Sequence, residues 1–211
     1  MARFSNGILG GLTGTIGPVI GSSINGVPYL KSRYAKRKVT NHPMEIANRR
    51  KFAAAHAFLY PLLDVVREGF RVDGKSRGFV TAKSWLLKNA FEGDWDNFQI
   101  NPALVKLSIG DLPLPSNITV KTPDPFIFEF SWDPLPVKDP NAKDQAVLIA
   151  YSIDKAHVES NMLGAFRSSG KDFLQIELKE AATYHLYIWF VSADRSRRSE
   201  SLYLGSLDAG G

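Results

Sequence analysis

TYHLYIWFVSA, residues 183–193, and FIFEFSW, residues 126–132, are the two stretches that decide the fold class of this chain. In both, large apolar side chains recur at every second position. A period of two places alternate side chains on one face of a β-strand, whereas an amphipathic helix needs a period near 3.6. Both stretches are therefore predicted to be β-strands.

Short segments of the same kind continue on both sides of these stretches, separated by turns that are rich in proline. Seven short strands at such spacing are typical of an antiparallel β-sandwich. We predict a sandwich over residues 113–211, with strands at 118–121, 126–132, 145–153, 163–168, 173–178, 183–193 and 199–206.

The segment before the sandwich, residues 39–112, is predicted to be a helical region with a terminal strand. Apolar residues spaced by three and four positions predict a helix over 44–68, and Pro61 should kink or split it. Asn41 or Thr40 ahead of Pro43 is a helix start signal. A second helix is predicted over 79–91 and a strand over 104–109.

The first 38 residues form a Gly-rich arm in which short β-prone pieces alternate with turns. Asn25-Gly26 lies between Ile24 and Val27, and this pattern is the strongest short signal for a β-hairpin. Glycine weakens an isolated strand, so we expect the arm to pair with another sheet. The chain is thus predicted to be α+β, in three segments: 1–38, 39–112 and 113–211.

Charge is divided unevenly along the 211 residues. Residues 1–51 hold nine basic residues and one acid, whereas residues 111–211 hold ten basic and fourteen acidic residues. This asymmetry indicates that the basic end contacts something acidic. The predicted partner-binding residues are Lys31, Arg33, Lys36, Arg37, Lys38, Arg49, Arg50 and Lys51.

Three interpretations of this basic segment stay open. It could dock on the acidic sandwich of a neighbouring copy, which we favour because of the charge asymmetry. It could bind nucleic acid through residues 31–51, since Tyr34 lies among its cations and could stack on bases. It could also be a passive, solvated linker. The favoured function is a non-enzymatic structural protein that self-assembles or docks on a protein partner.

No catalytic, cofactor-binding or metal-binding residues are predicted. The chain contains no cysteine, which excludes a Cys nucleophile and Cys-based zinc sites. Residues 69–76 match the phosphate-loop pattern G-x-x-x-x-G-K-S, but that motif needs a strand before it, and a helix is predicted there instead. The glycines of residues 7–26 lack the G-x-G spacing of a dinucleotide site. The four histidines are dispersed, and no carboxylate pair stands out as an acid/base dyad.

The sequence shows neither a signal peptide nor an 18-residue apolar stretch, because glycines interrupt the apolar pieces near the N-terminus. Cytoplasmic synthesis is the default expectation. No membrane span or small-molecule substrate is predicted, and the location stays open.

Two resemblances add to these expectations. Residues 117–207 resemble a fibronectin type III or related immunoglobulin-like domain, because Trp132 in FSWDP lies where that fold keeps a core tryptophan on an early strand. ATYHLYIWFVSADRSRRSESLYLG is similar to the last hairpin of that domain, and the resemblance implies an adhesive or spacer module.

Most of the chain also resembles an uncharacterised family of small proteins from the Bacteroidetes. The matching stretches are NGILGGLTGTIGPVIGSSINGVPYLKSR, RKVTNHP with RRKFAAAHAFLYPL, and AFEGDWDNFQINPALVKLSIGDLP. This family is known only as a domain of unknown function, so the resemblance implies no established activity.

Overall fold

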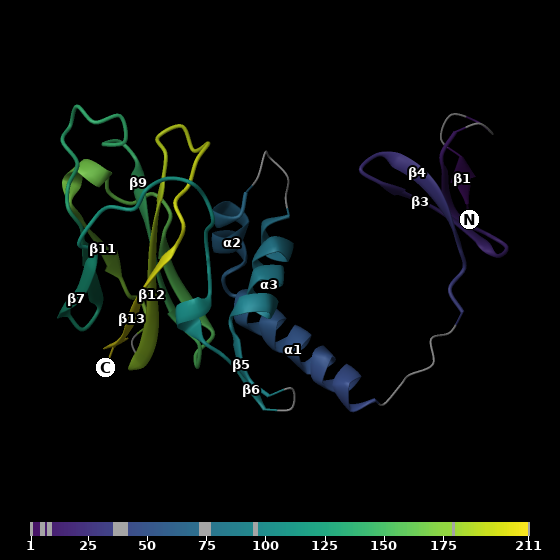
Figure 1. Cartoon of the computed structure of the whole chain (residues 1–211), viewed down its shortest axis with the longest axis horizontal. Coiled ribbons are helices and arrows are strands. Elements are labelled where there is room, and N and C mark those ends of the chain that lie inside the picture. Colours follow the sequence, from purple (N-terminus) through teal and green to yellow (C-terminus); the bar gives the residue numbers. More distant parts are fainter. Residues whose placement is uncertain are drawn as a thin grey trace. The chain divides into compact units, whose positions relative to one another are not determined.

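The computed structural model describes residues 2–4, 7, 10–35, 42–71, 77–94, 97–178 and 180–210. It divides the chain into two compact units, Met1–His42 and Pro43–Gly211. Figure 1 shows both units, and each is described here by itself.

The smaller unit is a four-stranded antiparallel meander in the order β1-β2-β3-β4. Its strands are β1 (Arg3–Phe4), β2 (Leu12–Ile16), β3 (Val19–Ile24) and β4 (Val27–Ser32). The predicted hairpin turn is confirmed: Asn25 and Gly26 have φ angles of 52° and 83°, as a type I′ turn requires. The described strands of the arm pair with one another, whereas we expected them to pair with another sheet.

Three helices open the larger unit: α1 (Pro43–Leu59), α2 (Leu63–Gly69) and α3 (Gly78–Asn89). The predicted break at Pro61 separates α1 from α2, because proline has no N–H to donate within a helix. Pro43 is the first helical residue, where its missing N–H costs nothing, and the capping positions 40 and 41 lie outside the described residues.

Seven strands then form two antiparallel sheets, as predicted. One sheet has the order β11-β8-β7 and the other the order β10-β9-β12-β13. The strands are β7 (Thr119–Asp124), β8 (Ile127–Ser131), β9 (Gln145–Ser152), β10 (His157–Asn161), β11 (Lys171–Gln175), β12 (Ala182–Val191) and β13 (Leu202–Ala209).

Two of the predicted strands are wrong. The fourth sandwich strand is β10 rather than 163–168, a segment that instead contains a bridge at Phe166 and the start of a 3₁₀ turn, Arg167–Ser169. Residues 104–109 are not a strand. The connection after α3 forms a two-stranded ribbon of β5 (Phe91–Gly93) and β6 (Phe98–Ile100), followed by a 3₁₀ turn, Pro102–Leu104.

The larger unit has three layers, because β9 and β12 are buried on both faces. Side chains at the even-numbered positions of these strands, such as Leu148 and Ile188, lie in the core between the two sheets. Side chains at the odd-numbered positions, such as Ile149 and Trp189, pack under the helices. The helices therefore cover the outer face of the four-stranded sheet, as Figure 1 shows, and share a core with it. The predicted core tryptophan, Trp132, is 4% exposed and lies in the core between the sheets.

Within the described ranges, no helix is long and apolar enough to cross a membrane.

Candidate partner-binding surfaces

The sheet of the smaller unit has an apolar face that its own residues do not cover. Pairing of Phe4 with Leu12 and of Gly21 with Leu30 places these residues on one face, together with Ile16. Phe4, Ile16 and Leu30 are 49%, 48% and 64% exposed. Among the described residues of this unit, Gly21 alone is classed as buried. The sheet therefore lacks a hydrophobic core of its own.

This apolar face is concave. A hollow of about 410 Å³ is lined by residues of three strands and of the loop before β2, including Phe4, Leu12 and Leu30. Gly21 explains the curvature: a Cβ atom at this position would collide with the carbonyl oxygen of Leu12, so glycine lets β2 lie close over β3.

The tip of the β3–β4 hairpin is a second exposed apolar surface of the arm. Ile24 and Val27 pair directly across the two-residue turn. They are 58% and 67% exposed. The tip thus presents two adjacent branched apolar side chains on a narrow hairpin.

The outer edge of β4 is poorly suited to adding another strand. Arg33 donates its backbone N–H to the carbonyl of Pro18 across the β3–β4 pair, at 2.6 Å. Because backbone groups alternate in direction along an antiparallel strand, position 28 faces the outer edge. Pro28 has no N–H to offer there, which blunts the edge.

The structure divides the predicted basic residues between the two units. In the smaller unit, the Lys31 ammonium lies 5.9 Å from the ring centre of Tyr29 and 5.2 Å from that of Tyr34. Its hydrogen bond with Tyr34, followed by the charge effects of Tyr29 and Tyr34, raises the pKa of Lys31. Arg33 is exposed. The other predicted cations of the arm, Lys36, Arg37 and Lys38, lie outside the described residues.

Arg49, Arg50 and Lys51 lie on α1 in the larger unit. The Arg49 Nε donates weakly to the carbonyl of Glu45, at 3.4 Å. The Lys51 ammonium lies 5.8 Å and 5.5 Å from the ring centres of Phe91 and Phe98, so it covers the β5–β6 ribbon. Two of the eight residues are thus described in the smaller unit and three in the larger unit.

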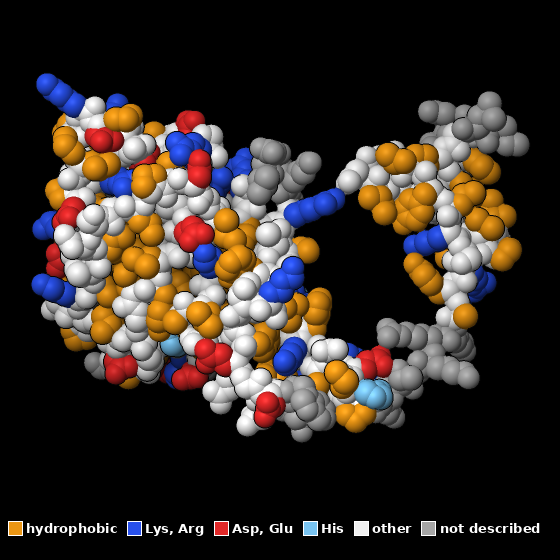
Figure 2. Space-filling view, in the orientation of Figure 1, with side chains coloured by type: hydrophobic (Ala, Val, Ile, Leu, Met, Phe, Trp, Pro, Cys, Tyr) orange, Lys and Arg blue, Asp and Glu red, His pale blue; other side chains and the backbone are white. Residues whose placement is uncertain are grey.

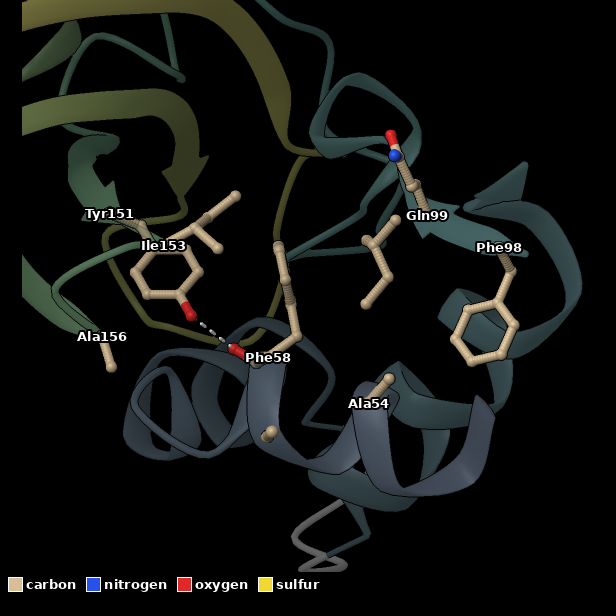
Figure 3. Close-up of a pocket in the computed structure, with 9 residues that line it drawn as sticks. Ala54, Phe58, Phe98, Gln99, Tyr151, Ile153 and Ala156 are labelled. Atoms are coloured by element: carbon tan, nitrogen blue, oxygen red, sulfur yellow. Dashed lines mark hydrogen bonds between the residues drawn. The ribbon is translucent and has the colours of Figure 1, made fainter. Parts of the chain in front are cut away.

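An apolar groove that the sequence did not predict lies in the larger unit, beside α1. Its volume is about 460 Å³. Its walls come from α1, from β6 and from the end of β9 with the turn that follows, as Figure 3 shows. The lining residues are Ala54, Ala57, Phe58, Phe98, Gln99, Ile100, Tyr151, Ile153 and Ala156.

The hydroxyl of Tyr151 is hydrogen-bonded within the protein. Its hydroxyl donates to the carbonyl of Phe58 at 3.0 Å, and the two rings meet edge to face at 5.2 Å. Burial raises the pKa of Tyr151 to about 12, so this hydroxyl stays protonated at neutral pH. The groove is therefore suited to apolar side chains rather than to a charged ligand.

Charged groups of both signs lie on the elements that form the groove, including Arg50 and Lys51 on α1. Asp154 follows Ile153 in the turn, and Glu92 pairs across the ribbon with Gln99. Neither carboxylate has an ion-pair partner among the described residues, although Glu92 accepts a hydrogen bond from Asn101. Lys155 pairs with Glu180, and Lys51 lies over the ribbon phenylalanines. Figure 2 shows acidic side chains along the lower edge of this unit.

No metal centre is found among the described residues. They contain no group of His, Asp and Glu residues that could hold a metal ion. Gly69, the first residue of the phosphate-loop match, ends a helix rather than a strand, and residues 72–76 of the match lie outside the described residues. Three histidines are engaged internally: His56 with Phe79, His157 with Glu159 and His185 with Tyr203.

Fold and surfaces together define an α+β protein with a helix-covered sandwich, a second unit that is a four-stranded β arm, and exposed apolar surfaces on both units. The chain belongs to the family described as "Family of unknown function (DUF6266)", whose model matches residues 11–205. That match includes strands of the arm as well as the larger unit, so both are parts of one family architecture. A search of curated proteins found no match for this chain.

Proposed function

We propose that this protein is a non-enzymatic structural protein that self-assembles, with the arm of one copy docking on a neighbouring copy. The observation that carries the proposal is the uncovered apolar surface of the arm, where Phe4, Leu30 and Val27 are about half to two-thirds exposed. A four-stranded sheet without a core is marginal in water, so a partner surface would stabilise it. Because the strands already pair with one another, docking would use the face or the hairpin tip rather than the edge.

Charge supports a neighbouring copy as the partner. Residues 1–42 contain six basic residues and no acid, whereas residues 111–211 have four more acids than bases. Opposite charge on two copies speeds association and fixes its orientation. Figure 2 shows basic and apolar side chains, but no acidic ones, on the visible face of the smaller unit.

The sandwich supports the same class of function. We infer that it is of the fibronectin type III or immunoglobulin-like type. Support comes from its three-stranded and four-stranded sheets, with Trp132 between them, packed edge-on against Phe190 at 5.3 Å. Domains of this type are mostly adhesive or spacer modules, although fold alone does not fix function.

The test is the solution mass of the full-length chain and of a chain lacking residues 1–42, by size exclusion with light scattering at low and high salt. We expect the full-length chain to assemble at low salt, with a mass that falls as salt rises, and the shortened chain to be monomeric. Monomeric masses for both chains at every concentration would refute self-assembly.

A second candidate function, binding of single-stranded nucleic acid, rests on a different observation. Tyr34 is 76% exposed next to Arg33, and Lys31 lies over its ring. Aromatic rings among cations suit base stacking and phosphate contact. This function predicts an affinity that falls steeply with salt and is lost when Arg33, Lys36, Arg37 and Lys38 are changed to Gln. Unchanged binding in that variant would exclude these residues as the site.

A further inference from the structure

We propose that the apolar groove beside α1 in one copy receives the β3–β4 hairpin tip, Ile24 and Val27, from a second copy. This inference rests on the proposed function and names the surface of the neighbouring copy that accepts the arm. It thereby joins two features that the structure shows on different units: an uncovered apolar tip and an apolar groove.

Shape selects the tip over the rest of the arm. The groove is a hollow of about 460 Å³, and the main apolar face of the arm surrounds a hollow of its own. Two concave surfaces cannot fill each other. The hairpin tip is convex and narrow, because its two strands lie about 4.8 Å apart in the pairing direction. The β2–β3 turn also pairs two branched residues, Ile16 and Val19, but Val19 is partly buried. Ile24 and Val27 are both exposed and are therefore the better candidates for entry into a groove.

The apolar lining of the groove also suits the apolar side chains of the tip. Ala54, Ala57 and Phe58 form the α1 wall, while Phe98 and Ile100 form the ribbon wall. The Tyr151 hydroxyl at the groove already donates a hydrogen bond to the Phe58 carbonyl, so a ligand does not need to accept one from it. Filling the groove with the branched side chains of the tip removes apolar surface from water on both partners.

Charge supports a second copy as the partner of the arm. The arm that carries the tip has no acidic residue. Glu92 lies on the ribbon and Asp154 in the turn after β9, while Arg50 and Lys51 lie on α1, so the elements that form the groove carry both signs of charge. Residues 111–211, which supply the β9 wall of the groove, have four more acids than bases, and this charge difference favours a second copy as the partner of the arm.

The contact uses two different surfaces, so it is heterologous. Each copy offers one tip and one groove. Such contacts propagate into filaments or close into rings, and two reciprocal contacts would close a dimer. The solution mass distinguishes these products without affecting the inference itself.

Cross-linking tests the contact directly, because the chain has no cysteine of its own. A Val27→Cys chain is mixed under mild oxidation with a tagged, full-length Ala57→Cys chain. The mixed disulfide requires its two Cα atoms to come within about 7 Å, so it forms fastest between copies that hold these positions together. The matched control replaces Val27→Cys by Ile16→Cys, an exposed apolar position of the arm away from the tip.

We expect the mixed disulfide to form with Val27→Cys at least about tenfold faster than with Ile16→Cys, reflecting a local concentration in the contact that free collision lacks. Equal rates for the two cysteine positions would overturn the inference. A double variant that carries both cysteines and forms only an internal disulfide would also overturn it, since the tip would then lie in its own groove.

Filling the groove gives a second test on cysteine-free protein. Ala57→Leu places a larger side chain in the groove, while Ala53→Leu makes the same change at an exposed α1 position that does not line it. We expect Ala57→Leu to weaken self-association at least about tenfold and Ala53→Leu to leave it unchanged, because the groove would lose room for a tip side chain.

The two failures can be told apart. If removal of residues 1–42 abolishes assembly but Ala57→Leu does not weaken it, the arm docks elsewhere, and this inference fails while the proposed function stands. If the full-length chain is monomeric at all concentrations, the proposed function fails and takes this inference with it.

Discussion

Two neighbouring arginines, Arg197 and Arg198, show how burial determines what an ion pair contributes to the stability of this protein. Arg198 donates to Glu68 of α2 at 3.0 Å, and their side chains are 6% and 22% exposed. It also donates to the carbonyls of Arg71 and Arg195, at 3.3 Å. Arg197 pairs with Asp111 at 2.9 Å, but their side chains are 51% and 73% exposed. Arg198 thus ties the helical layer to the loop after β12, whereas Arg197 lies in solvent.

Replacing Arg198 by alanine should destabilise the larger unit much more than the same change at Arg197. Arg198→Ala leaves Glu68 with only the longer ion pair to Arg71, at 3.6 Å, and removes the donor to two backbone carbonyls, at a cost of about 3 kcal/mol. Arg197→Ala removes an exposed pair worth less than about 1 kcal/mol. Urea unfolding of both variants measures the difference. Equal losses would mean that the Arg198 network contributes little beyond a surface pair.

The sequence predicted single residues well where one physical requirement dominates. Asn25 and Gly26 were predicted from the positive φ angles of a hairpin turn, and Pro61 from its missing N–H. The partner-binding role of the basic residues stays a prediction, because charge alone does not say which surface it contacts.

At the scale of elements, Gly69 shows why a motif match can be structural. It is the last residue of α2, and a Cβ atom there would collide with the carbonyl of Leu107. Its own carbonyl accepts hydrogen bonds from Ile109 N–H and from the Ser108 hydroxyl, both at 3.2 Å. Glycine is needed because α2 ends against the 107–109 segment, which explains this position of the phosphate-loop match without any phosphate.

Gly69→Ala should therefore destabilise the larger unit by about 1–3 kcal/mol, because backbone atoms rather than flexible side chains would have to move. Lys88→Ala, an exposed change on α3, is the control and should shift stability by less than about 0.5 kcal/mol. Thermal or urea unfolding gives both values. A Gly69→Ala chain as stable as the wild type would show that α2 can move away from the segment freely.

Elements with strong periodicity were predictable, and the misses have physical reasons. Residues 104–109 have the alternating pattern of a strand, and Val105 and Leu107 are buried. The segment does not join a strand ladder, however, and Leu107 donates its N–H to the Ser201 hydroxyl. The ribbon strands β5 and β6 have three residues each and are set by tertiary contacts such as Phe91 on Phe98. The groove needs α1, this ribbon and the end of β9 together, so no single stretch of sequence could indicate it.

At the scale of the whole chain, the two units differ in how they can be stable. Both hydrophobic clusters consist of residues from Pro43–Gly211, including those under the helices and those between the sheets. The smaller unit has hydrogen-bonded strands but no comparable cluster among its described residues. Hydrogen bonds alone contribute modest net stability, so we expect the arm to be only marginally stable by itself.

Deleting residues 1–42 should leave the stability of the larger unit almost unchanged. We expect the melting temperature of the 43–211 chain at low concentration to lie within about 3 °C of the full-length value, because 1 kcal/mol corresponds to about 2–4 °C at this size. If the arm docks on a second copy, the full-length melting temperature should rise with protein concentration, since association stabilises the folded state by mass action. The 43–211 chain should show no such rise. A large loss of melting temperature on deletion, with no dependence on concentration in either chain, would instead mean that each arm stabilises its own copy.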